Sequence, residues 1–281
     1  SPICNNLFYI GSNDRGSYGV IIAHIMPIEI ISGSRVSSTI ELAKGLRVRS
    51  KFPVLFLHGI GNGPEKLEPH AQLFREKGVM AISVQIPPYD NRLFNFGHVA
   101  NWCKKEIDKI GSGRVGIVGQ SLGGLIALKF AASYPDQVAY LVINSSPCGK
   151  AHEAKWWLVT MLRMLKPLPP QIIKTGLGAL GSIPGVRINE LSFLLRNNPR
   201  ELIRCYLGHT QHDWTEEVRA IPKTVPIVFR RSIKDRPLNM AGYKAIYEAN
   251  DAVLLEDPNG GHEIPQPDFI LAMAAMAMSR L

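Results

Sequence analysis

The sequence predicts an α/β fold, with a mostly parallel central sheet and helices on both of its faces. From Phe52 onward, short β-branched runs alternate with longer helical patterns, which is typical of βαβ units. The 281 residues suffice for one large domain or for one domain with an insertion. Hydrophobic residues make up 46% and charged residues 20% of the chain, so we expect a folded globular protein.

The expected elements follow one another in βα order. "VLFLHG" predicts a buried strand, and the next helix begins near Pro69 and ends at Gly78. The strand "VMAISVQI" follows, and apolar residues at helical spacing then predict a helix that ends before Gly111. The strand "RVGIVG", a helix from Leu122 to Ala132 and the strand "VAYLVIN" complete this half of the chain.

The regular alternation stops after the strand that ends near Asn144. Residues 147–214 are rich in Leu, Met, Trp and Pro and have no clear strand pattern, which predicts a helical cap or lid inserted there. We therefore expect an α/β core in two parts, 1–146 and 215–281, with the cap at 147–214 between them. The second part resumes with the strand "VPIVFRR", a helix over Met240–Ala249, the strand "AVLLED" and a C-terminal helix.

The first fifty residues give a mixed pattern. "GVIIAHIMPIEII" predicts antiparallel edge strands, whereas "STIELAKG" has a partly helical pattern. The apolar stretch "YGVIIAHIMPIEII" is too short and too often interrupted by polar residues to predict a membrane span.

Charge, cysteine and histidine usage exclude several function classes. The formal net charge is +9, but the basic residues are scattered and accompany no nucleic-acid-binding motif, so we expect no nucleic acid partner. The four cysteines form no CxxC pair, which favours a reducing, cytoplasmic location. His209 and His212 lie three residues apart beside Asp213, but no third well-spaced ligand accompanies them, so no metal site is expected.

A serine between two glycines interrupts the apolar stretch "VGIVGQSLGGLIAL". A strand enters Gly119 and a helix leaves at Leu122, so the chain must reverse within about one residue, and the glycines relieve the crowding there. Ser121 would then expose its hydroxyl at the carboxyl edge of the sheet, where a helix N-terminus favours developing negative charge. The alternative is a tight turn with a capping serine, but the strand before it and the helix after it favour a nucleophile.

A serine nucleophile needs a histidine to take its proton and a carboxylate to orient that histidine. His262 in "NGGHEIP" lies in a glycine-rich loop after the last expected strand. Asp235 lies in the loop after "VPIVFRR", at the same edge of the sheet. The strand end at Asn144 carries no carboxylate, so Asp235 is the candidate acid.

These pieces resemble the α/β-hydrolase superfamily. The resemblance rests on "LFLHGIGNG", "GQSLGG", the post-strand Asp235 and "GGHEIP", in that order, and it extends from about Phe52 to the C-terminus. It implies Ser121 as the nucleophile, Asp235 as the acid and His262 as the base.

An acyl-transfer site also needs donors for the oxyanion, and two backbone N–H groups can supply them. Leu122, directly after the nucleophile, gives one. The resemblance implies that Ile60 gives the other, or Gly61 if the loop is shifted. His58 is expected to brace this loop rather than to take part in the chemistry.

The leading hypothesis is a serine hydrolase that cleaves a carboxylic ester, or a thioester, through an acyl-enzyme without a cofactor. "KWWLVTMLRMLKPLPP" favours a lid over an apolar pocket rather than a membrane-surface helix, so we expect a small-molecule substrate with an apolar group. Two alternatives stay open. One is elimination, C–C cleavage or acyl transfer on the same triad, and the other is a ligand-binding receptor of the same fold.

Overall fold

A seven-stranded sheet forms the centre of the computed structural model, which describes residues 8–10, 19–21, 30–32, 51–87, 96–146, 156–181, 198–235 and 250–281. The strand order is β3-β9-β8-β7-β6-β4-β5, and every neighbouring pair is parallel. The strands are β3 (Ile30–Ser32), β4 (Val54–Leu57), β5 (Ala81–Val84), β6 (Val115–Gln120), β7 (Val138–Asn144), β8 (Ile227–Ser232) and β9 (Val253–Asp257). All residues of β4, β6 and β7 are buried, because both faces of the sheet are covered.

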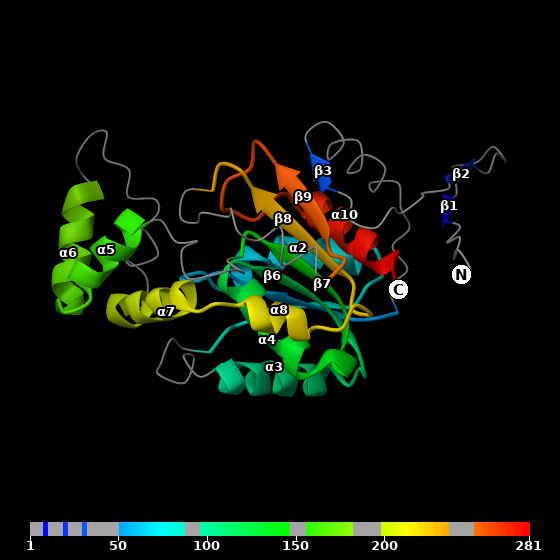
Figure 1. Ribbon diagram of the computed structural model, residues 1–281, viewed down its shortest axis with the longest axis horizontal. Coiled ribbons are helices and arrows are strands. Elements are labelled where there is room, and N and C mark those ends of the chain that lie inside the picture. The colour runs from blue at the N-terminus through cyan, green and yellow to red at the C-terminus, as the bar shows by residue number, and fades with distance from the viewer. Residues whose placement is uncertain are drawn as a thin grey trace.

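Helices cover the sheet on its two faces (Figure 1). In the described part of the chain, one layer contains α3 (Phe96–Ile110), α4 (Leu122–Ser133) and α8 (Thr215–Ala220), and the other contains α2 (Glu68–Glu76) and α10 (Pro267–Met278). Short 3-10 turns lie at Pro64–Lys66 and Pro135–Gln137. Alternate residues of β4 serve the two layers, since Leu55 packs with α3 and α4 whereas Phe56 packs with α2 and α10.

Three further helices lie between β7 and β8 among the residues that the structure describes. They are α5 (Trp156–Leu165), α6 (Pro170–Gly181) and α7 (Pro199–Gln211). Both α5 and α6 contact α7, and Figure 1 shows the three helices to one side of the sheet. Leu162 of α5 is fully buried, whereas Trp156 at its start is 78% exposed. The helical insertion predicted after Asn144 is confirmed, and its expected limits at 147 and 214 stay a prediction.

The N-terminal strands differ in part from the expectation of antiparallel edge strands. β2 (Gly19–Ile21) does pair antiparallel with β1 (Phe8–Ile10), in a separate two-stranded sheet. β3, however, lies at the edge of the large sheet and runs parallel to β9, so the prediction is wrong there. A short apolar run does not encode strand direction, because its side chains alternate in the same way in parallel and antiparallel pairs.

The other predicted strands and helices occur within a few residues of their expected positions, wherever they fall in the described ranges. The helical patterns in "STIELAKG" and over Met240–Ala249 lie outside those ranges. None of the described helices has the length and apolar character needed to cross a membrane.

Candidate active site

Ser121 occupies the sharp turn between β6 and α4. Its backbone has φ 51° and ψ −114°, a conformation that residues other than glycine rarely adopt. Its N–H donates to the carbonyl of Asn144 at 2.9 Å, and its own carbonyl accepts from Oγ of Ser146 at 2.8 Å. These bonds to the end of β7 hold the turn, and they fix where the Ser121 side chain begins.

Two glycines beside Ser121 allow α4 to begin directly at the sheet. A Cβ added at Gly119 would lie 2.6 Å from the carbonyl oxygen of Gly123. A Cβ added at Gly123 would lie 2.0 Å from the carbonyl oxygen of Leu57, at the end of β4. The spacing of the glycines around the serine therefore reflects close contact between helix and strand ends.

Three residues that are distant in sequence meet at the carboxyl edge of the sheet. Nε2 of His262 lies 3.0 Å from Oγ of Ser121, and Nδ1 of His262 lies 2.8 Å from Oδ2 of Asp235. The Asp235 side chain is 1% exposed and that of His262 is 24% exposed. The structure thus brings together the three residues selected from the sequence, with the carboxylate sealed behind the imidazole.

The loops that carry Asp235 and His262 are bonded to each other and to the sheet. The N–H of Lys234 donates to the carbonyl of Gly260 at 3.2 Å, which joins the two loops. Nε2 of Gln120, the residue before the serine, donates to the carbonyl of His262 at 3.3 Å. The histidine is therefore tied through its backbone to the strand that carries the serine.

The loop after β4 lies against Ser121. A Cβ added at Gly59 would be 3.5 Å from the Cβ of Ser121. Leu122 is the first residue of α4, where an N–H group has no acceptor within the helix. The carbonyl of Ser121 accepts instead from the N–H groups of Gly124 and Leu125. Within the described residues, the N–H groups of Ile60 and Leu122 donate to no acceptor, which suits the oxyanion role expected of them.

His58 is fully buried beneath this loop. Its Nδ1 donates to the carbonyl of Gly59 at 2.9 Å, and its Nε2 accepts from the N–H of Ile86 at 3.2 Å. Burial lowers the pKa of His58, although the hydrogen bond to Gly59 acts in the opposite direction. The neutral His58 ring can therefore donate one hydrogen bond and accept the other. These two bonds hold the loop in place, as expected from the sequence.

Helix α7 belongs to the insertion after β7. Tyr206 on this helix is buried, and burial followed by the negative charge of Asp235 raises the pKa of its hydroxyl.

His212 belongs to a different cluster, at the end of α7. Its Nε2 lies 3.0 Å from Oε1 of Glu217, which also pairs with Lys129 at 3.4 Å. Its ring makes an edge contact with Trp214, with the ring centroids 4.8 Å apart. No group of three or more metal-ligating side chains occurs in the described parts of the chain.

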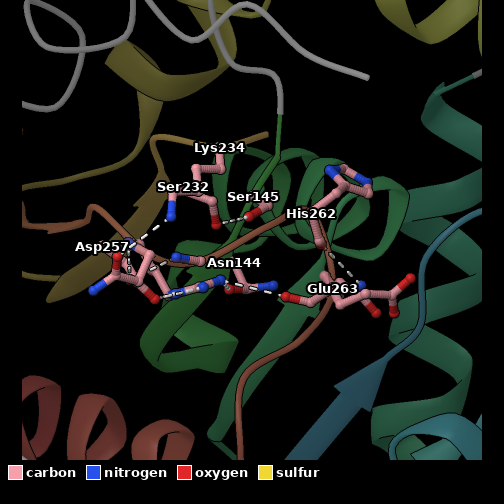
Figure 2. Close-up of polar contacts among 11 residues, drawn as sticks. Asn144, Ser145, Ser232, Lys234, Asp257, His262 and Glu263 are labelled. Carbon is pink, nitrogen blue, oxygen red and sulfur yellow. Dashed lines mark hydrogen bonds and ion pairs between the residues drawn. The ribbon is translucent and has the colours of Figure 1, made fainter. Parts of the chain in front are cut away.

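A buried charged pair lies beside the site, and the sequence patterns described above do not predict it. Arg230 on β8 is 2% exposed and donates to Asp257 at the end of β9. Figure 2 shows Asp257, Asn144 and Glu263 along one run of polar contacts, with His262 adjacent to Glu263 in the chain. The sequence feature that could have indicated the buried pair is the basic pair Arg230-Arg231 inside the otherwise apolar strand "VPIVFRRS".

Comparison with known proteins identifies the fold. Residues 53–166 match the family model described as alpha/beta hydrolase fold. An esterase from Exiguobacterium antarcticum has a TM-score of 0.60 at 17% identity, over 76% of this chain and 86% of that chain. A bromoperoxidase from Bacillus anthracis has a TM-score of 0.59 at 12% identity, over 82% of this chain and 90% of that chain. The chain therefore has the alpha/beta hydrolase fold, with a Ser-His-Asp arrangement at the edge of its sheet.

One curated relative is similar in sequence. It is a pimeloyl-[acyl-carrier protein] methyl ester esterase from Shewanella woodyi, 33% identical over 122 residues. The match spans 43% of this chain and 43% of that relative, so this chain aligns with less than half of the relative's length.

Proposed function

We propose that the protein is a serine hydrolase that cleaves carboxylic esters, or thioesters, of small molecules with an apolar group. The observation that carries the proposal is the chain of short contacts from Ser121 Oγ through the His262 ring to Asp235. A hydroxyl is a weak nucleophile at neutral pH, and this arrangement supplies the base that activates it.

In the proposed reaction, Ser121 Oγ attacks the ester carbonyl carbon while Nε2 of His262 takes the hydroxyl proton. The N–H groups of Leu122 and Ile60 bind the oxyanion, and such donors are each worth about 10²–10³ in rate. His262 then gives the proton to the leaving alcohol, which departs and leaves an acyl-enzyme. Water, deprotonated by the same imidazole, releases the acid and restores Ser121. Asp235 holds the tautomer in which Nε2 is free to accept.

The insertion after β7 would act as the cap over the acyl group. Its buried side chains include Leu162 and Ile203, which join the same apolar cluster as the sheet. The curated relative, a methyl ester esterase by its name, agrees with ester cleavage and suggests methyl esters as one substrate series to test.

The test is turnover of p-nitrophenyl esters from acetate to laurate, and of the matching methyl esters. The wild type is compared with Ser121→Ala and with Ser133→Ala, which removes an exposed hydroxyl at the far end of the same helix. We expect turnover by the wild type and Ser133→Ala, with loss in Ser121→Ala. Covalent labelling of Ser121 without ester turnover would favour non-hydrolytic chemistry. Ligand binding with neither labelling nor turnover would favour a receptor.

A further inference from the structure

The loop that carries His262 is folded around a buried guanidinium. Nε and Nη2 of Arg230 donate to Oδ2 of Asp257 at 3.1 and 2.7 Å. Nη1 donates to Oδ1 of Asn144 at 2.7 Å and to the carbonyl of Glu263 at 3.4 Å. One side chain on β8 therefore bonds to the end of β7, to the end of β9 and to the residue after His262.

The turn that leads to His262 packs directly onto this ion pair. Oδ1 of Asp257 accepts from the N–H groups of Asn259 and Gly260 at 3.0 and 2.8 Å. A Cβ added at Gly260 would lie 2.0 Å from Nη2 of Arg230, so a larger residue there would have to displace the guanidinium. The aromatic ring of Phe269 from α10 lies 5.5 Å from the guanidinium carbon.

The same guanidinium also bonds to the residue that supports the serine. Asn144 accepts from Arg230 through its side chain, and its backbone carbonyl accepts the N–H of Ser121 at 2.9 Å. Arg230 is thus bonded to Asn144, which supports the Ser121 turn, and to Glu263, which follows His262 in the chain. Guanidinium suits this place because its planar set of donors can bond to several acceptors in fixed directions.

We propose that Arg230 is a positioning residue that holds the His262 ring in place between Ser121 and Asp235, at hydrogen-bond distance from both. It touches neither reacting group, and it acts through Asn144, Asp257 and the Glu263 carbonyl. The inference rests on the catalytic role proposed above for His262.

The test compares Arg230→Met, which keeps much of the side-chain length but removes the donors, with Arg231→Met. Arg231 is the next residue of the same strand and pairs with Glu256 at 3.0 Å rather than with the His262 loop. A third variant, Arg230→Met with Asp257→Asn, removes both charges of the buried pair. Thermal melting, ester turnover and the rate of labelling by a fluorophosphonate are measured below the melting transition of every variant.

We expect Arg230→Met to lower kcat and the labelling rate by about 10- to 100-fold with KM unchanged, because small misplacements of reacting groups have effects of this size. The double variant should regain thermal stability relative to Arg230→Met without regaining the rate. Arg231→Met should keep the wild-type rate. If Arg230→Met does not fold, Arg230→Lys, which keeps the charge but not the planar fork, takes its place with the same expected result.

An NMR measurement that requires no turnover tests the positioning role of Arg230 independently of the proposed function. The imidazole N–H that bonds to Asp235 gives a downfield proton resonance, assigned by its loss in His262→Gln. We expect it in the wild type and in Arg231→Met but not in Arg230→Met. Wild-type resonance and labelling in Arg230→Met, or full recovery of the rate in the double variant, would overturn the positioning role alone. A wild type with the resonance but no labelling would overturn the proposed function instead.

Discussion

Nε2 of His262 lies 3.0 Å from Oγ of Ser121, although the two residues are 141 positions apart in the chain. They meet because β6 and β9 are parallel members of one sheet, and the loops after parallel strands lie at a common edge. The sheet topology therefore assembles the candidate site from three separate loops.

Asp235→Asn tests the role of the buried carboxylate. An amide can bond to the imidazole in the wrong tautomer, so we expect kcat to fall by on the order of 10⁴ while the fold is kept. Kinetics on the best p-nitrophenyl ester, with circular dichroism as the check on folding, measure this. The matched control is Asp136→Asn, at an exposed aspartate, which should behave as wild type. Equal activity of the two variants would contradict the acid role.

Gly123→Ala tests the close contact between α4 and β4. The new methyl group would lie 2.0 Å from the carbonyl oxygen of Leu57, so helix and strand must separate. We expect a loss of about 1–3 kcal/mol in the free energy of unfolding, together with a large loss of activity because Ser121 shifts with the helix. Urea denaturation measures the first effect. Gly113→Ala, where an added Cβ meets nothing within 4 Å, should change neither quantity.

The residues of the candidate site differ in how far the sequence predicts them. Ser121 and His262 stand in glycine-rich local patterns, and Asp235 follows a recognisable strand, so the sequence alone suffices to select each of them. It does not suffice for Arg230, because the role of this residue depends on Asn144 and Asp257, which lie 86 and 27 positions away. Only the order of strands in the sheet brings these three side chains together.

The strands of the sheet also differ in how well the sequence predicts them, because some depend on local patterns and others on distant partners. Apolar runs predict β6 and β7 well, because strands buried on both faces need continuous apolar side chains. The expectation of antiparallel pairing is wrong for β3, since its partner β9 is more than two hundred residues away and a three-residue run encodes no direction. Expectations on 147–155, 182–197 and 236–249 fall outside the described residues.

The histidine under the oxyanion loop makes stability depend on pH. Burial, followed by smaller opposing effects of a hydrogen bond and a nearby carboxylate, lowers the pKa of His58 below 6.5, and burial likewise lowers that of His70. As the pH falls, these two histidines therefore bind protons at a higher pH in the unfolded chain than in the folded chain. We expect the free energy of unfolding to decrease as the pH falls below about 6.5, with the full contribution present above that value. Urea melts between pH 7.5 and 5.5 should show a weaker slope in His58→Gln. An unchanged slope in His58→Gln and in the double variant with His70→Gln would contradict this.

Asp257 makes stability depend on pH in a lower range. Burial alone would raise its pKa, but the hydrogen bonds and charge of Arg230 outweigh burial and hold the pKa below its ordinary value of 3.8. Its stabilising effect is present above that value and is lost as the pH falls through the lower folded-state pKa. We expect Asp257→Asn to melt below the wild type at pH 7, with the difference shrinking below about pH 4. A difference that stays constant down to pH 2.5 would count against the ion pair.

Labelling with a fluorophosphonate, followed by mass spectrometry of the labelled peptide, is the direct test of Ser121 as an activated nucleophile. We expect a single phosphonylated residue, Ser121, in the wild type, and no labelling in Ser121→Ala or, within the same time, in His262→Gln. Folded wild-type protein that stays unlabelled, or that is labelled at another serine, would contradict it.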